Sequence, residues 1–334
     1  MMHSGFHDQS SYDLTQNNRE VNINEYTFAQ ERFDERFGLI FFMKSKSSAR
    51  TIFVKERSSS LPSEQIHEIS NRLNIRGNYL LHIYGIKQVP ESGNFQIYFE
   101  DFTSDLQTEI KKHLANKTRF SEAELYAILY SSISALAALE QYGLSHDFIV
   151  PFNILKFSKD VYKLHDNFVI SNRSYLYNHA LRGQYLRYLA PELLENVTRN
   201  KETPDHHDRV KADIFALGMC ILDAGLLNTE GDFINKKLMI LDERALHQAL
   251  QKFEQLYSPA MRQILEDMLF PDPSKRPNPL TLFKRLPGKP VIKDSQSSGK
   301  KRKVLDQIIN NSSPEVTENF LCFLSFVIVE IRPF

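Results

Sequence analysis

The chain has 334 residues, of which 42% are hydrophobic and 25% are charged, as in an ordinary globular protein. Lysine plus arginine and aspartate plus glutamate number 41 each, so no overall field favours nucleic acid or an acidic membrane surface as a partner. The two cysteines, Cys220 and Cys322, lie far apart in the sequence. This spacing argues against a disulfide framework and predicts a reducing, intracellular compartment.

The first part of the chain predicts a polar arm followed by strands. Residues 1–25 are rich in Ser, Asn, Gln and His and are expected to be disordered, with no apolar core of a secretory signal. From Tyr26 to Val54, short aromatic and aliphatic runs around a polar interruption predict hairpins. Apolar spacing predicts a helix over Ser63–Leu73. Two further strands are predicted over Leu80–Tyr84 and Phe95–Phe99.

Beyond Asp101 the pattern becomes helical. Ser121 and Glu124 form an S-x-x-E capping box at the start of an apolar-periodic segment. The run from Ile214 to Leu227 is almost wholly apolar, as in a buried helix, and Pro259 is placed to begin another helix. A strand-rich region before a larger helical region predicts an α+β fold rather than alternating βαβ units.

The run from Ser145 to Asn153 resembles the catalytic loop of protein kinases, H-R-D-L-K-P-x-N. The matching residues are His146, Pro151 and Asn153. Without a gap, Phe148 stands where the family has its catalytic aspartate. Phosphoryl transfer needs a carboxylate there to orient the hydroxyl and accept its proton. If one residue is inserted before Asn153, Asp147 becomes the catalytic base instead, and this alternative stays open.

Five further motifs, one before this run and four after it, stand in the order found in protein kinases. They are Lys55 after a V-A-I-like run, Asp166 opening a D-F-G-like triplet, Glu192 closing A-P-E, Asp213 opening a D-x-W-S-x-G-like helix, and Arg276 in a D-P-x-x-R-P-like segment. The resemblance covers residues 26–287 and implies a two-lobed fold, with a small β-rich lobe (26–100) and a larger α-helical lobe (103–287). It implies that Glu192, Asp213 and Arg276 are structural, with Arg276 pairing with Glu192.

The nucleotide site implied by the resemblance is degenerate. The residues placed to bind nucleotide are Gly38, Lys55, Glu68 (with Glu64 as the alternative), Glu100, Phe102 and Leu155, and the metal ligands are Asn153 and Asp166. Of the three glycines in the phosphate loop only Gly38 remains, although close approach of backbone N–H groups to phosphate requires them. Phe53 replaces the small alanine that covers the adenine and fills that space. No cofactor is certain, and Mg-ATP is expected only if nucleotide binding is retained.

Residues 288–334 predict a basic linker and a short apolar tail. Residues 300–304, Lys-Lys-Arg-Lys-Val, resemble a nuclear import signal. The apolar run from Phe320 to Val329 is too short for a spanning helix of roughly 20 residues. We therefore expect protein partners of unknown identity, no nucleic acid and no stable membrane insertion. The expected location is cytoplasmic, with nuclear entry if residues 300–304 act as a signal.

Three functions are compatible with the sequence. The first is a pseudokinase, a scaffold or allosteric regulator with weak or no ATP binding. The second is a divergent active serine/threonine kinase, which would use Lys55, Glu68, Asp147, Asn153 and Asp166. The third is a nuclear adaptor that works through its linker and tail, with the folded domain as a rigid mount.

Overall fold

The computed structural model describes residues 25–34, 38–57, 72, 75, 77–89, 92, 94–158, 161–166, 181, 183–198, 208–227 and 232–286. The chain divides into two units, residues 1–290 and 291–334, and the second lies wholly outside the described residues. The predictions for the N-terminal arm before residue 25, for Glu64 and Glu68, and for the linker and tail also fall outside them.

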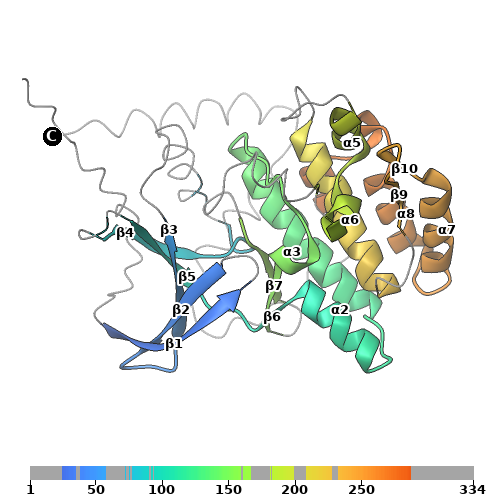
Figure 1. The fold of residues 1–334 in the computed structure, drawn as a ribbon. Coiled ribbons are helices and arrows are strands. Elements are labelled where there is room, and N and C mark those ends of the chain that lie inside the picture. Colours follow the sequence, from blue (N-terminus) through green and yellow to red (C-terminus); the bar gives the residue numbers. More distant parts are fainter. Residues whose placement is uncertain are drawn as a thin grey trace, which may run out of the picture. The chain divides into compact units, whose positions relative to one another are not determined.

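The N-terminal part is a five-stranded antiparallel sheet with the strand order β1-β2-β3-β5-β4 (Figure 1). Its strands are β1 (Tyr26–Asp34), β2 (Gly38–Ser45), β3 (Thr51–Arg57), β4 (Ile83–Gln88) and β5 (Phe95–Glu100). Side chains alternate between the two faces of a strand. In β3, Ile52 and Val54 therefore join one apolar cluster, whereas Phe53 joins the other.

The prediction of a strand over Leu80–Tyr84 is wrong in its first half, because β4 begins only at Ile83. The preceding residues pair with another element instead. Leu81 N donates to Leu164 O at 2.8 Å, and Leu164 N donates to Tyr79 O at 2.8 Å. This long-range pairing connects the N-terminal sheet region to β8 (Val161–Leu164).

The C-terminal part is mainly helical, which together with the sheet confirms the predicted α+β class. Its helices are α2 (Leu106–Ala115), α3 (Glu122–Gln141), α5 (Pro191–Thr198), α6 (Arg209–Leu226), α7 (Glu243–Glu254), α8 (Pro259–Met268) and α9 (Pro279–Arg285). The short 3₁₀ helices among the described residues are η2 (Pro151–Asn153), η4 (Gly183–Tyr188) and η5 (Pro273–Lys275). Short strands that the sequence did not predict are β6 (Ser104–Asp105), β7 (Ile154–Ser158), β8, β9 (Ile234–Asn235) and β10 (Ile240–Leu241).

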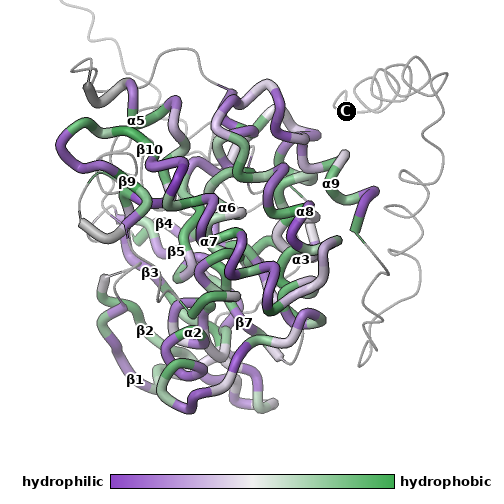
Figure 2. Tube along the Cα trace, turned by 90° about the vertical axis from the view of Figure 1, so that its right-hand side faces the viewer, coloured by the Kyte–Doolittle hydropathy of each residue, from purple (hydrophilic) through white to green (hydrophobic). Residues whose placement is uncertain are grey.

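Local sequence explains where the main helices begin and what they bury. The capping box predicted at Ser121 is present, with Glu124 N donating to Ser121 Oγ at 3.3 Å and Ser121 N donating to Glu124 Oε2 at 2.8 Å. Helix α6 is buried from Ala212 to Leu226. Helix α7 is amphipathic, and hydrophobic and hydrophilic residues alternate along it in Figure 2.

Glu109 of α2 connects this helix to β7. It lies 2.7 Å from Lys112 Nζ and 2.5 Å from Lys156 Nζ, and it is 7% exposed. Burial alone would raise the pKa of Glu109, but the hydrogen bonds from Lys112 and Lys156 outweigh it and lower the pKa to about 2. Glu109 is therefore ionised in the folded protein at any pH above this value.

Candidate functional site

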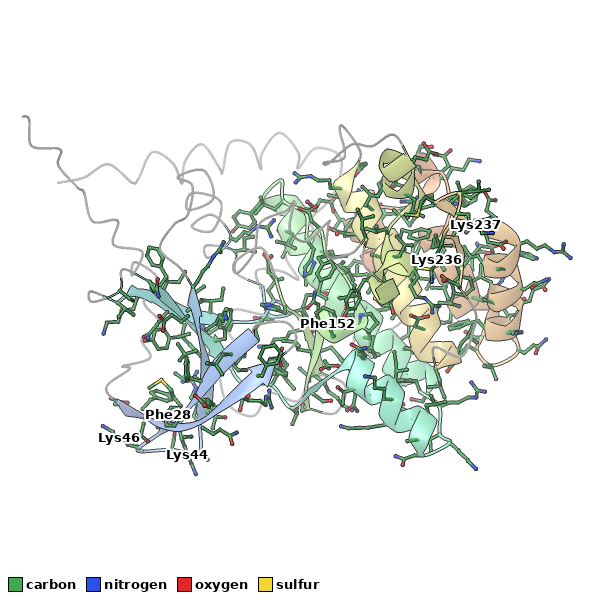
Figure 3. The ribbon with its side chains drawn as sticks, in the orientation of Figure 1. Phe28, Lys44, Lys46, Phe152, Lys236 and Lys237 are labelled. Carbon is green, nitrogen blue, oxygen red and sulfur yellow. The ribbon has the colours of Figure 1, made fainter. Side chains whose placement is uncertain are left out.

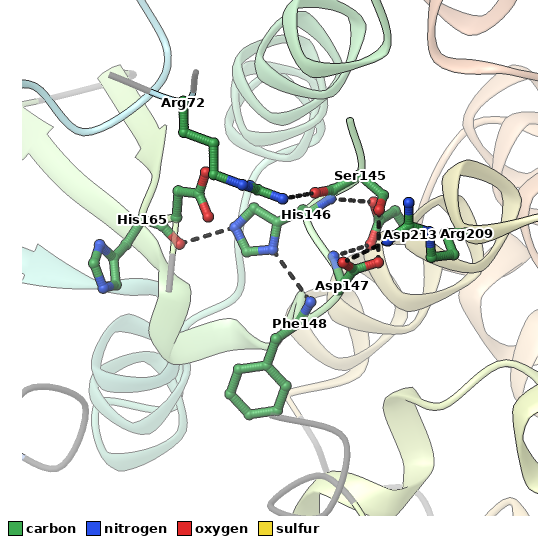
Figure 4. Close-up of polar contacts among 9 residues, drawn as sticks. Arg72, Ser145, His146, Asp147, Phe148, His165, Arg209 and Asp213 are labelled. Carbon is green, nitrogen blue, oxygen red and sulfur yellow. Dashed lines mark hydrogen bonds and ion pairs between the residues drawn. The ribbon is translucent and has the colours of Figure 1, made fainter. Parts of the chain in front are cut away.

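The catalytic-loop segment is fixed to helix α6 through its backbone. Asp213 of α6 accepts His146 N at 2.7 Å and Asp147 N at 2.9 Å (Figure 4). His146 is fully buried, and its Nε2 lies 2.8 Å from His165 O. Burial, and then the neighbouring carboxylate of Asp147, raise the pKa of Asp213 well above its usual range. Asp213 thus holds the backbone of the catalytic-loop segment.

The side chain of Asp147 is directed into the fold. Its φ of +66° lies in the left-handed region, which Asp adopts more readily than most residues. Its carboxylate accepts Ser145 Oγ at 2.6 Å and lies 3.5 Å from Arg209 Nη1. Only 8% of its side chain is exposed. This carboxylate is therefore engaged by the protein itself.

Phe148 occupies the next position and points away from the polar cluster around Asp213 (Figure 4). It is 5% exposed and packs edge-on against Phe152 at 5.9 Å and Tyr185 at 6.1 Å between ring centroids. Asn153 Nδ2 donates to Phe148 O at 2.9 Å. Phe152 lies among the elements of the helical part, far from Phe28 on β1 (Figure 3). A buried aromatic side chain therefore occupies the position where the ungapped match expects a carboxylate.

The two residues predicted as metal ligands have different surroundings. Asn153 is fully buried, and its Oδ1 has no hydrogen-bond partner among the described residues. The carboxylate of Asp166 is already in an ion pair, because its Oδ2 lies 2.5 Å from Arg72 Nη1. Arg72 also donates from Nη2 to Ser145 O at 2.8 Å, and its side chain is 1% exposed. A buried guanidinium stays charged, so Asp166 already has a full positive charge beside it.

Gly38 and Lys55 lie next to each other at the start of the sheet. Gly38 has a φ of +69°, which favours glycine, and a Cβ there would lie 3.3 Å from Lys55 Nζ. Lys55 Nζ lies 3.5 Å from Leu39 O. Partial burial lowers the pKa of Lys55. The predicted pair between Lys55 and Glu68 is not tested, because Glu68 lies outside the described residues.

Aromatic side chains from the sheet and from the segment after β5 pack around Phe53 of β3. Phe53 is 0% exposed and stacks on Phe99 with centroids 4.9 Å apart and ring planes 11° apart. The ring of Phe102 meets Phe53 edge-on at 5.7 Å. Leu155 of β7 and Ile40 of β2, both 0% exposed, belong to the same cluster. This cluster is continuous from the sheet to the first strand after the catalytic loop.

Hydrogen bonds and an ion pair of Glu100 and Asp101 hold the connection between the sheet and the helical part. Glu100 accepts Lys163 Nζ at 2.5 and 2.7 Å, and its Oε1 accepts His82 N at 2.6 Å. Phe102 N donates to Asp101 Oδ1 at 2.9 Å, and Thr51 Oγ1 donates to Asp101 Oδ2 at 2.5 Å. The carboxylates of Glu100 and Asp101 and the N–H of Phe102 are therefore paired within the protein.

Glu192 and Arg276 form a buried bidentate ion pair. The guanidinium of Arg276 lies 2.8 Å from Glu192 Oε1 and 2.7 Å from Oε2, and its side chain is 0% exposed. It also donates to Phe270 O and Pro271 O, and it lies over the ring of Phe215 at 5.0 Å. The pair thus joins α5, α6 and the segment before α9.

A family model for the protein kinase domain matches residues 36–286, which is more than half of the chain. The chain belongs to the protein kinase family. None of the curated proteins compared matches it. In the described part of the chain, no helix is long and apolar enough to cross a membrane, and no group of three or more His, Cys, Asp or Glu side chains could hold a metal ion.

Protein kinases use Mg²⁺ and ATP, and the residues of this kinase domain fit that pair poorly. The metal-ligand aspartate, Asp166, is already neutralised by Arg72. The space that the family leaves for adenine is filled by Phe53, which packs on Phe99 and Phe102. The N–H of Phe102, which the resemblance assigns to nucleotide binding, donates to Asp101. The arrangement of these side chains therefore does not fit a Mg-ATP complex.

Arg72 is the site residue that sequence reasoning missed. It lies within the helix predicted over Ser63–Leu73, and it is itself helical. The available signal was its spacing, since it follows Glu68 by four residues and such residues share a helix face. Asp101 is also absent from the residues that the sequence predicts for the site. Its contacts with Thr51 and Phe102 N depend on long-range packing.

Proposed function

We propose that this protein kinase domain is a pseudokinase, which transfers no phosphate and acts through protein contacts as a scaffold or allosteric regulator. The single observation that carries the proposal is the burial of Phe148 where the family has its catalytic aspartate. A positioned general base contributes roughly 10²–10⁴-fold to such reactions, and a phenyl ring can neither accept a proton nor orient a hydroxyl.

The surroundings of Asp147 support the same proposal. As a substitute base, Asp147 would need a carboxylate oxygen directed at a substrate hydroxyl. Its two oxygens instead face Ser145 Oγ and Arg209 Nη1. We therefore do not favour the active serine/threonine kinase.

Protein partners are proposed because the balanced charge gives no field for nucleic acid. The structural elements that hold the helical part together are kept, as the Arg276–Glu192 pair illustrates. A domain that keeps its architecture without its chemistry can still present surfaces. A cytoplasmic location, with nuclear entry through residues 300–304, belongs to the same proposal.

A phosphoryl-transfer assay tests the proposal. The purified chain is incubated with γ-labelled ATP, Mg²⁺ or Mn²⁺, and mixed protein substrates, beside an active kinase. We expect no transfer above the level of an Asp147→Asn variant. The Phe148→Asp variant, which restores a carboxylate at the family position, is also expected to stay inactive because the adenine space remains filled. Transfer by the natural chain that Asp147→Asn abolishes would overturn the proposal.

A further inference from the structure

The guanidinium of Arg72 lies beside the catalytic-loop segment, and a dashed line in Figure 4 joins it to Ser145. It contacts Asp166 Oδ2 at 2.5 Å and Ser145 O at 2.8 Å. Arg72 comes from the segment between β3 and β4, whereas Ser145 and Asp166 flank β7 and β8. The contact therefore joins the sheet region to the helical region.

The burial of this pair is a second indication that the guanidinium has a specific role. The side chain of Arg72 is 1% exposed and that of Asp166 is 12% exposed. An arginine cannot lose its charge in a protein, so a buried arginine must be matched by a carboxylate and by hydrogen-bond acceptors. Here Asp166 supplies the carboxylate and Ser145 supplies a carbonyl oxygen.

The charges around the loop make one cation necessary at Asp166 and a second one on the same carboxylate unfavourable. Asp147, Asp166 and Asp213 bring three carboxyl groups close to His146, and Arg209 lies 3.5 Å from Asp147. Arg72 supplies positive charge directly on Asp166. A divalent ion bound to the same carboxylate would lie next to the guanidinium, and two cations that close together repel each other strongly in a dry site.

A second oxygen is available beside this cluster. Asn153 Oδ1 is buried and has no hydrogen-bond partner among the described residues. Asn153 is connected to the Asp166 segment, since His165 N donates to Asn153 O at 2.9 Å. Amide and carboxylate oxygens are the ligands that Mg²⁺ and Mn²⁺ prefer. Asn153 thus keeps an acceptor for a metal ion, whereas Oδ2 of Asp166 is paired with Arg72.

We propose that Arg72 is a built-in cation, whose guanidinium replaces the divalent metal ion at Asp166 and holds the two parts of the domain together without metal or nucleotide. The inference goes beyond the proposed function and rests on it only in that both concern the same site. The chemistry that Arg72 displaces is that of a hard divalent cation with oxygen ligands. The domain is therefore assembled permanently in a metal-free form.

The test measures binding of Mn²⁺ alone, by electron paramagnetic resonance of the free ion, to the full chain and to variants at Arg72, Arg209 and Asp166. The natural chain and Arg72→Lys, which keeps the charge, are expected to bind no Mn²⁺ at the site. Arg72→Met, which keeps the length but not the charge, should gain one site. With two side-chain ligands, its dissociation constant should be on the order of 10⁻⁴–10⁻³ M. Arg209→Met is the matched control, because it removes a cation from the same cluster and leaves Arg72 on Asp166.

Either of two results with folded chains would overturn the inference. One is saturable Mn²⁺ binding to the natural chain that Asp166→Asn abolishes. The other is a folded Arg72→Met chain, judged by circular dichroism, that gains no site or gains one that survives Asp166→Asn. If Arg72→Met does not fold in the presence of a chelator, the inference expects Mn²⁺ to restore its cooperative melting, and failure to do so counts against it. Phosphate transfer by the natural chain would overturn the proposed function but not this inference, since no nucleotide is present here.

Discussion

Replacement of Phe53 with alanine should destabilise the domain and open space for an adenine ring. Phe53 is 0% exposed, stacks on Phe99 at 4.9 Å and meets Phe102 edge-on at 5.7 Å. Truncation of a buried phenylalanine costs about 3–5 kcal/mol, a range that includes the loss of a stacked ring pair. We therefore expect Phe53→Ala to lower the free energy of unfolding by about 4 kcal/mol. This is a large part of the stability of about 5–15 kcal/mol of a typical domain.

Urea unfolding with and without adenosine measures both effects. The midpoint of the natural chain should not change with adenosine. The midpoint of Phe53→Ala should be lower without ligand and should rise with it. At ten times the dissociation constant the gain is about 1.4 kcal/mol. Adenosine is the chosen probe because it carries no phosphate and needs no metal.

Phe42→Ala is the matched control, because Phe42 belongs to the same cluster and its ring lies 6.3 Å from Phe53. It should lower the midpoint without creating a response to adenosine. The reasoning fails if adenosine stabilises the natural chain as much as Phe53→Ala. It also fails if Phe53→Ala costs less than about 1 kcal/mol, since a buried ring that costs so little is not packed as described.

Three further outcomes are expected. Glu192→Ala should destabilise the chain by about 3–5 kcal/mol in urea unfolding, because it leaves the buried charge of Arg276 unpaired, and a loss below about 1 kcal/mol would contradict this. The pKa of Glu109 is about 2 in the folded chain and 4.5 ordinarily, so its stabilisation is present above pH 4.5 and is lost as the pH falls towards 2. Glu109→Gln should therefore cost about 3 kcal/mol at pH 7 and about half as much at pH 3, whereas an equal loss at both values would refute the assignment. Gly225→Ala should lower the melting temperature clearly, because its Cβ would overlap the ring of the buried Phe253, and an unchanged value would show that this contact is loose.

Local patterns predicted much of the fold because they act over a few residues. The capping box at Ser121 and the apolar run after Ile214 are signals of this kind, and both elements are present. The strand start at Leu80 was predicted wrongly because apolar content does not say with which element a segment pairs. Leu81 bonds to Leu164, far away in the sequence.

The resemblance implies the pairing of Arg276 with Glu192, which the structure contains, but it does not imply the other contacts around the catalytic loop. The presence of Phe148 at the ungapped position of the catalytic aspartate is visible in the sequence, because the family pattern has fixed spacing. The pairing of Arg72 with Asp166, and of Phe102 N with Asp101, depends on how distant segments meet. Neither a propensity nor a spacing rule contains that information.

Equilibrium dialysis of labelled ATP with Mg²⁺ against the natural chain tests most directly whether side chains have replaced the nucleotide site. The account predicts no saturable binding in the range of about 1 μM to 1 mM in which enzymes typically bind their substrates. Saturable binding in that range, lost when Lys55 is replaced by methionine, would contradict it.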